Sequence, residues 1–243
     1  MMKNKVADKS DFRLSKKDVG EMFNSISEKY DCLDHIMSLG IDRRWRKLVV
    51  KILKEDMPET ILDIATGTAD LAITTAKILK PKRIIGIDIA SKMIDVGKIK
   101  VFSEGVADIV ELMQGDAEQL DFEDNSFDAV MVSFGVRNFE DLAKGLSEMN
   151  RVLKKGGKAV ILEFSLPENI FIKWFYLLYF NKVVPFIGGL ISKNKLAYKY
   201  LPGSVSEFPY GENFLNIMSD NGFKYVNCKK LNQGICSIYT GKK

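Results

Sequence analysis

Two carboxylates stand at either end of a short turn of small residues. Asp63 and Asp70 enclose residues 65–69, and an apolar run precedes them. Small residues let a backbone approach a ligand, and the helix expected over Leu71–Leu79 offers unpaired amides at its start. The G-x-G-x-x-G pattern of dinucleotide sites fails, because Ala65 and Asp70 occupy two of its glycine positions. Acids at both ends would repel a pyrophosphate, so the turn predicts a ligand that is positively charged nearby. A packing turn with solvated acids is the alternative.

A further acid ends the next apolar run of the chain. Arg83–Asp88 reads as a strand, and Asp88 falls 25 positions after Asp63. Acids at this place in α/β folds accept hydrogen bonds from both ribose hydroxyls. Asp88 is therefore the best single cofactor residue that the sequence offers. The alternative is an acid at the start of the next helix, which Ser91 could cap equally well.

Two more strand ends carry polar side chains. Ile109–Met113 is expected to be the third strand and leads to Asp116, while Asp128–Ser133 is the fourth and leads into a loop that ends at Asn138. The carboxyl ends of parallel strands meet at one edge of an open sheet. This places Asp116 beside the cofactor and the loop where a substrate would meet it.

Helical patterns alternate with these strands, which predicts a mainly parallel sheet covered on both faces. The helix expected over Glu140–Leu153 is stopped by the glycines at 156 and 157, and Lys158–Glu163 is the fifth strand. Asn221–Cys228 and Ile235–Tyr239 read as two strands joined by a short turn, hence an antiparallel C-terminal edge. The fold class is therefore α/β. Two N-terminal helices precede the first strand, one from Val19 to near Asp31 and one over Asp42–Lys54.

The composition is that of one globular domain: 243 residues, 46% hydrophobic and 28% charged. The three cysteines form no C-x-x-C pair, so the sequence gives no sign of a disulfide framework or of a zinc site. A reducing cytoplasm is the predicted compartment. Residues 1–18 are polar and rich in lysine. They are predicted to be a mobile arm, and they lack the apolar core of a secretion signal. The domain is expected to run from 19 to 243.

The charge is distributed unevenly. Residues 55–148 hold 19 acidic and 9 basic side chains, whereas residues 170–243 hold 3 acidic and 10 basic ones. An acidic centre argues against nucleic acid as a partner, and the basic, aromatic-rich end suits an anionic membrane surface. Lysines, an asparagine and a proline interrupt the apolar segment 170–191, so it is not expected to span a bilayer. Two interpretations stay open, a core helix under the substrate pocket and an amphipathic lid that also contacts lipid.

These motifs together resemble the menaquinone and ubiquinone biosynthesis C-methyltransferase family of class I S-adenosylmethionine-dependent methyltransferases. The likeness covers about residue 19 to the C-terminus. At positions 34 and 42 this chain has Asp where the family usually has Asn and His. The stretches that carry the likeness are Tyr30–Trp45, similar to Y-D-x-M-N-x-x-x-S-x-x-x-H-x-x-W, then Ser133–Asn138, and Arg151–Gly157 with Leu162–Ser165.

The resemblance implies a Rossmann-like, doubly wound, mainly parallel seven-stranded sheet with an antiparallel C-terminal edge strand. A helical cap at 19–54 and an apolar helical lid, within a substrate- or lipid-facing insertion at 170–210, would complete it. The implied reaction is C-methylation of a polyprenylated quinol ring with S-adenosyl-L-methionine as cofactor and no metal. The residues implied for the cofactor are Asp63, Gly67, Thr68, Asp88, Asp116, Ala117 and Ser133, and those expected on the substrate side are Arg137, Asn138 and Tyr30.

The substrate is where alternatives stay open. Demethylmenaquinol, the precursor of menaquinol, is the favoured substrate. The benzoquinol of ubiquinone biosynthesis is one alternative. A small-molecule or sterol-type substrate is another, because the fold does not choose the chemistry. A nucleotide-dependent oxidoreductase would need the missing glycines, and a non-catalytic lipid-surface protein is a third class. The expected partners are the polyprenyl quinol and, peripherally, the inner membrane surface, without nucleic acid. A homodimer is an alternative that the sequence does not decide.

Overall fold

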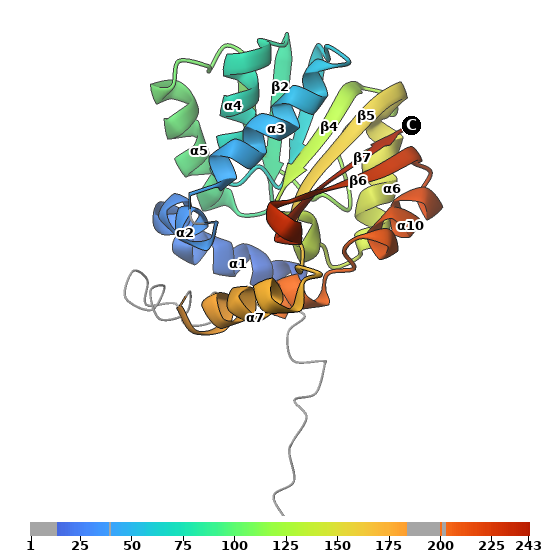
Figure 1. Ribbon diagram of the computed structural model, residues 1–243. Coiled ribbons are helices and arrows are strands. Elements are labelled where there is room, and N and C mark those ends of the chain that lie inside the picture. The colour runs from blue at the N-terminus through green and yellow to red at the C-terminus, as the bar shows by residue number, and fades with distance from the viewer. Residues whose placement is uncertain (1–13, 39, 184–199, 201–202) are drawn as a thin grey trace, which may run out of the picture.

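A seven-stranded sheet forms the centre of the computed structural model, which describes residues 14–38, 40–183, 200 and 203–243 (Figure 1). The strand order is β3-β2-β1-β4-β5-β7-β6. β7 pairs antiparallel with both β5 and β6, whereas the other pairings are parallel. The strands are β1 (Thr60–Ile64), β2 (Arg83–Asp88), β3 (Val110–Gln114), β4 (Phe127–Ser133), β5 (Leu153–Phe164), β6 (Lys224–Leu231) and β7 (Cys236–Lys242). The predicted Rossmann-like α/β fold is thereby confirmed, with a C-terminal hairpin at the sheet edge.

Helices cover both faces of this sheet. The main helices are α1 (Lys16–Ile26), α2 (Tyr30–Met37), α3 (Asp42–Lys54), α4 (Asp70–Leu79), α5 (Ser91–Ser103), α6 (Leu142–Val152), α7 (Ile170–Leu178) and α10 (Glu212–Asp220). Short helical turns lie at η1 (Ser27–Lys29), η2 (Val136–Asn138), η3 (Tyr179–Val183) and η4 (Asn232–Gly234). Residues from α3, α4 and α5 pack in one apolar cluster, and residues from α6 and α10 pack in the other. Successive strand residues such as Ile61 and Leu62 point into opposite clusters, as a sheet buried on both faces requires.

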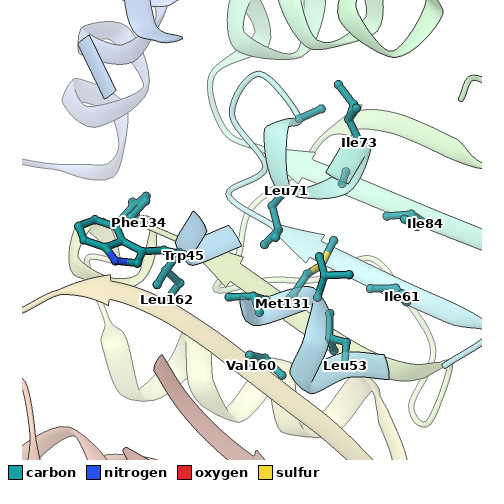
Figure 2. Packing of buried hydrophobic residues seen from close by; sticks show 14 of the residues in the cluster. Trp45, Leu53, Ile61, Leu71, Ile73, Ile84, Met131, Phe134, Val160 and Leu162 are labelled. Atoms are coloured by element: carbon teal, nitrogen blue, oxygen red, sulfur yellow. The ribbon is translucent and has the colours of Figure 1, made fainter. Parts of the chain in front are cut away.

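The larger cluster fixes α3 on the sheet. Leu53 of α3 lies beside Met131 of β4, while the Trp45 ring packs near Phe134 (Figure 2). The Trp45 and Phe134 ring centroids are 6.2 Å apart in an edge-on arrangement, and the indole Nε1 donates to Asn232 Oδ1 at 2.7 Å. This packing makes α3 part of the main helical layer. The other two helices of the predicted cap at 19–54 are α1 and α2, and they lie at the end of the sheet (Figure 1).

Three local predictions differ from the structure. The predicted arm 1–18 lies mostly outside the described residues, but α1 already begins at Lys16 because Ser15 Oγ caps it by accepting from the Asp18 amide. The first helix does not continue to Asp31, since the turn η1 breaks it after Ile26. The helix before β5 ends at Val152, with extended backbone at once, so the glycines at 156 and 157 belong to the strand.

The apolar segment after residue 170 is helical and largely exposed. α7 has exposed fractions of 74% at Phe171 and 60% at Trp174, and it lies next to α1 (Figure 1). Residues 184–199, 201 and 202 of the predicted insertion 170–210 lie outside the described residues. Within the described part of the chain, no helix has the length and apolar character needed to cross a bilayer.

Candidate active site

A cleft of about 670 Å³ opens at the carboxyl ends of β1, β2 and β4, next to α1 and α2. This is the edge at which open α/β sheets bind ligands. Seven of the ten predicted site residues line it: Tyr30, Gly67, Asp88, Asp116, Ala117, Ser133 and Asn138. Asp63, Thr68 and Arg137 do not line it.

The turn between β1 and α4 has an unusual backbone. Ala65, Gly67 and Ala69 all lie in the left-handed region, with φ values of 52°, 56° and 69°. Alanine rarely adopts this conformation, and such strain of about 1–3 kcal/mol per residue persists mainly where function selects it. The two alanines that break the glycine pattern therefore still form a turn of glycine-like geometry. A Cβ placed on Gly67 would lie 3.8 Å from Cε1 of Tyr30, so the tyrosine ring sits directly over the turn.

Asp88 joins this turn to the start of α5. Its Oδ2 accepts from the Gly67 amide at 2.8 Å, and its Oδ1 accepts from the Ala90 amide at 2.9 Å. Burial raises the pKa of Asp88, although these amides oppose the rise. A carboxylate has about four lone-pair sites, so two stay available to ribose hydroxyls. Both interpretations of Asp88 are compatible with this geometry, since it supports the entry to a helix and also faces the cleft.

The far end of the cleft is closed by a residue that the sequence reasoning assigned to the mobile arm. Lys16 Nζ lies 2.7 Å from Asp116 Oδ2 and 2.9 Å from Glu118 Oε2. Asp116 also accepts from the Glu118 amide through Oδ1, at 2.9 Å. The first turn of α1 is thereby fixed across the segment that was predicted to receive the adenine. The only sequence signal for this contact was a lysine next to the capping residue Ser15.

Ser133 supplies the clearest sign that the cleft is built for a ligand. Its Oγ is buried and has no hydrogen-bond partner among the described residues. Buried hydroxyls are normally paired, so a polar ligand atom fits here. The turn after Ser133 also approaches the β1 turn closely, because a Cβ on Gly135 would lie 2.5 Å from Cβ of Ala65. The orphaned hydroxyl, Asp88 and the left-handed turn together fit a nucleoside-type ligand such as S-adenosyl-L-methionine.

Arg137 is buried behind the cleft rather than free in it. Its Nη1 lies 2.7 Å from Glu163 Oε1, and the two side chains are 1% and 0% exposed. Burial raises the pKa of Glu163 despite the neighbouring guanidinium. The Arg137 Nε is buried without a partner among the described residues. Glu163 was not predicted as a site residue, and its only signal was an acid near the end of an otherwise apolar strand.

A second cleft of about 1140 Å³ adjoins the first. Arg137 and Tyr200 line it, and Asn138 and Phe139 line both clefts. The Tyr200 hydroxyl donates to Asn138 Oδ1 at 3.1 Å, which leaves the amide N–H groups of Asn138 as donors. The structure thus brings Asn138 and Arg137 together at the junction of two cavities, as two reacting ligands require.

Tyr30 lines the first cleft from α2. Burial, and then the charge of Asp34, raise the pKa of its phenol. The phenol is therefore protonated at neutral pH and can donate a hydrogen bond, but it is not a base. Its ring also makes an edge contact with Phe23, with centroids 6.0 Å apart.

The other two predicted residues outside the first cleft are Asp63 and Thr68. Asp63 is 1% exposed and accepts from Thr66 Oγ1 at 2.6 Å, and burial raises its pKa to about 7. Thr68 Oγ1 donates to Asp31 Oδ1 and accepts from Lys100 Nζ at 3.0 Å. Both hydroxyl contacts point to a polar cluster outside the cleft, so a direct cofactor contact of Thr68 stays a prediction. Among the described residues, no group of three or more His, Cys, Asp or Glu side chains could hold a metal ion.

Comparisons with known proteins agree with this geometry. The chain is 46% identical to the demethylmenaquinone methyltransferase of Bacteroides fragilis, over 93% of this chain and 92% of that protein. It is 44% identical to the ubiquinone/menaquinone biosynthesis C-methyltransferase UbiE of Geotalea daltonii, over 96% of this chain and the whole of that protein. The fold matches a SAM-dependent methyltransferase of Thermotoga maritima with a TM-score of 0.61 at 20% identity, covering 92% of this chain and 99% of that one. The model of the ubiE/COQ5 methyltransferase family matches residues 11–243, and the chain belongs to this family of S-adenosylmethionine-dependent methyltransferases.

Proposed function

We propose that this protein methylates a ring carbon of demethylmenaquinol, a polyprenylated naphthoquinol, to give menaquinol. The observation that carries the proposal is the junction of two clefts at Asn138 and Phe139, one suited to the cofactor and the other open to a second ligand. The relative from Bacteroides fragilis is a demethylmenaquinone methyltransferase, which supports a naphthoquinol. The alternative is a benzoquinol, because the Geotalea relative's name includes ubiquinone.

S-adenosyl-L-methionine, when bound, supplies an electrophilic methyl group on a sulfonium. The residues proposed to hold it are Gly67 and Thr68 at the methionine portion, Asp88 at the ribose, Asp116 and Ala117 at the adenine edge, and Ser133 near the sulfonium. Asp63 would act from beneath the turn without touching the ligand. Holding two reactants in a fixed geometry can supply much of the barrier reduction on its own.

The substrate-side residues stabilise charge on the quinol oxygen. A quinol carbon becomes nucleophilic when a neighbouring hydroxyl loses its proton. Arg137, fixed by Glu163, contributes an immobile positive charge and an unpaired Nε–H donor, while Tyr30 contributes a protonated hydroxyl. Fixed donors in a site that excludes water stabilise such an oxyanion strongly. His35, the sole histidine of the sequence, has its Nδ1 3.1 Å from Asp42 Oδ1 and lines another cavity, so we do not assign it as the base.

Labelled S-adenosyl-L-methionine and both candidate quinols under reducing conditions test the reaction. Mass spectrometry should find one added methyl group on the naphthoquinol and none on the benzoquinol. Methylation of the benzoquinol alone would reassign the substrate. Absence of product from both, with the cofactor bound in a calorimetric titration, would overturn the proposed reaction.

We further propose that α7 rests peripherally on an anionic bilayer at the inner membrane surface, from which a polyprenyl quinol would enter. Ile170, Phe171, Trp174 and Phe175 of α7 are 60–74% exposed, and Lys173 lies among them. Exposed apolar side chains interspersed with lysine are typical of interfacial helices.

Vesicle sedimentation tests this membrane contact. Replacing Trp174 and Phe175 by alanine should weaken binding to vesicles of anionic phospholipid by at least about 30-fold, because each ring removes apolar area worth at least about 1 kcal/mol. The matched control replaces Ile99 and Phe102, which are 71% and 79% exposed on α5. Equal effects of the two double variants, or no binding by the unmodified protein, would reject the contact.

A further inference from the structure

α2 carries Tyr30 to the cleft, and charged contacts join this helix to its neighbours. Among the described side chains of the helix, the one that is fully buried is a carboxylate, Asp34, at 1% exposure. Cys32 is exposed and Ile36 is half-buried. The carbonyl of Ile36 also accepts from the Tyr179 hydroxyl. The contacts of its acidic side chains are therefore candidates for holding α2 in place.

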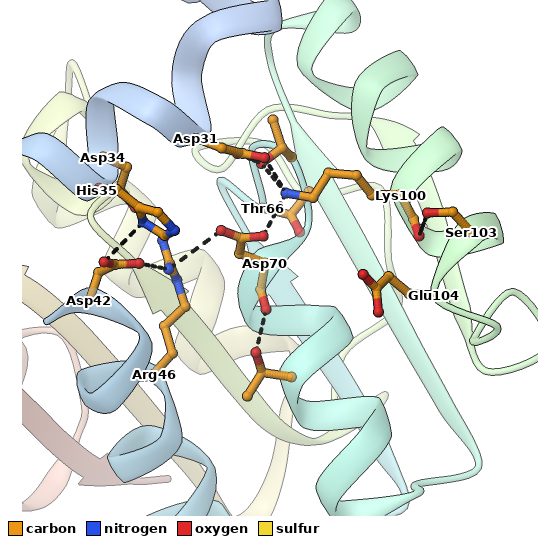
Figure 3. Close-up of polar contacts among 12 residues, drawn as sticks. Asp31, Asp34, His35, Asp42, Arg46, Thr66, Asp70, Lys100, Ser103 and Glu104 are labelled. Atoms are coloured by element: carbon orange, nitrogen blue, oxygen red, sulfur yellow. Dashed lines mark hydrogen bonds and ion pairs between the residues drawn. The ribbon is translucent and has the colours of Figure 1, made fainter. Parts of the chain in front are cut away.

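Arg46 of α3 is the first cation that these acids meet. Its guanidinium pairs with Asp34 through Nη2 and with Asp42 through Nη1, and Nη1 also lies 3.4 Å from Asp70 Oδ2 (Figure 3). The Arg46 side chain is 7% exposed. One buried guanidinium thus joins α2, α3 and the first residue of α4.

Lys100 of α5 makes a second connection between the same two parts. Its Nζ lies 2.6 Å from Asp31 Oδ2 and 2.5 Å from Asp70 Oδ1 (Figure 3). The same Nζ is 3.0 Å from Thr68 Oγ1, which itself donates to Asp31. Both cations therefore bridge an acid of α2 to Asp70, where the cofactor turn becomes α4.

We infer that Arg46 and Lys100 are positioning residues that fix α2 to the turn between β1 and α4 and thereby hold Tyr30 over the cleft. Tyr30 immediately precedes Asp31, and its ring edge lies against Gly67. A shift of α2 would displace the phenol from the first cleft, which Tyr30 lines. The part that concerns catalysis rests on the proposed function, whereas the attachment of α2 can be measured without substrate.

Lys100→Met is the most direct test, because Lys100 is outside both clefts and partly exposed. Hydrogen–deuterium exchange of the free protein should show amides of residues 30–38 exchanging at least about 10-fold faster in Lys100→Met, as expected when a helix loses its anchor. Lys98→Met is the matched control, since Lys98 lies exposed on the same helix and has no ion pair in the structure. Lys100→Arg should keep the wild-type exchange because it retains the cation. Unchanged exchange in Lys100→Met, or the same acceleration in Lys98→Met, would overturn the inference.

Kinetics then separate positioning from a general loss of structure. Lys100→Met should lower kcat about 10-fold with little change in melting temperature. In a Tyr30→Phe background the same substitution should change kcat less than about 2-fold, because the effects of residues that act through one another are not additive. Full additivity of the two substitutions would show that Lys100 does not act through Tyr30. If the protein methylates neither quinol, the exchange measurement still decides whether Lys100 holds α2.

Discussion

Replacing Glu163 by leucine should destabilise the protein strongly, because it leaves Arg137 buried without its counter-charge. The two side chains are almost completely inaccessible, and the ion pair is 2.7 Å long. Glu163 also accepts from the amides of Phe164 at 2.9 Å and Arg137 at 3.3 Å. Removing one partner of a buried pair costs about 3–5 kcal/mol. In a chain of this length each kcal/mol lowers the melting temperature by about 2–4 °C, so a decrease of roughly 6–20 °C is expected.

The double variant Arg137→Met with Glu163→Leu separates stability from chemistry. Replacing a whole buried ion pair by apolar side chains of similar volume is often neutral in stability, so we expect recovery to within about 2 kcal/mol of wild type. Turnover should nevertheless stay at least about 100-fold below wild type, since the fixed guanidinium is gone. Cofactor affinity measured by calorimetry should be nearly unchanged, because neither residue lines the first cleft.

Thermal denaturation, urea titration and quinol turnover provide the assay. Glu104→Leu is the matched control, because it makes the same change at the Lys77 ion pair, where both side chains are 47% exposed. An exposed pair of this kind contributes about 0–1 kcal/mol. The reasoning fails if Glu163→Leu is no more destabilising than Glu104→Leu, or if the double variant regains wild-type turnover.

Two other sites give independent predictions. Burial raises the pKa of Asp63 to about 7 in the folded state. The folded protein therefore binds this proton more tightly than the unfolded chain does. The stability that this proton contributes is lost as the pH rises from about 4 to about 7. Urea titrations should show wild type losing up to about 4 kcal/mol over this interval relative to Asp63→Asn, and parallel pH profiles would refute the assignment. Gly135→Ala should cost about 1–3 kcal/mol through its contact with Ala65 and weaken cofactor binding in calorimetry, whereas Gly20→Ala, with 3.7 Å to its nearest neighbour, should do neither.

The strands and helices that bury an apolar pattern could be predicted closely from the sequence. The bounds of Arg83–Asp88 and Asp42–Lys54 match the structure at both ends, because hydrophobic periodicity and a terminal acid act locally. Once parallel strands were expected, their polar ends had to meet at one edge. This is why Asp88 and Ser133 could be assigned to one cleft from the sequence alone.

Contacts between charged side chains could not be predicted in the same way. Nothing local indicates that Arg137 meets Glu163, or that Lys16 reaches Asp116 across 100 positions. The acids at 34 and 42 differ from the usual Asn and His of the resembled family. In the structure Asp34 and Asp42 both pair with Arg46, and their significance depends on a tertiary contact.

The expectation that the acids beside the β1 turn attract a cationic ligand stays a prediction, and the structure shows what else these acids contact. Asp70 is paired with Lys100 at 2.5 Å, and Asp63 is buried, with a pKa raised to about 7. Much of their negative charge is therefore already balanced by a cation or by a proton. Shape and hydrogen bonding are left as the main determinants on the cleft wall: a left-handed turn at Gly67, the orphaned hydroxyl of Ser133 and the carboxylate of Asp88. These features hold a ligand only at close range, so the shape of the turn and the residues beside it determine how well a ligand fits.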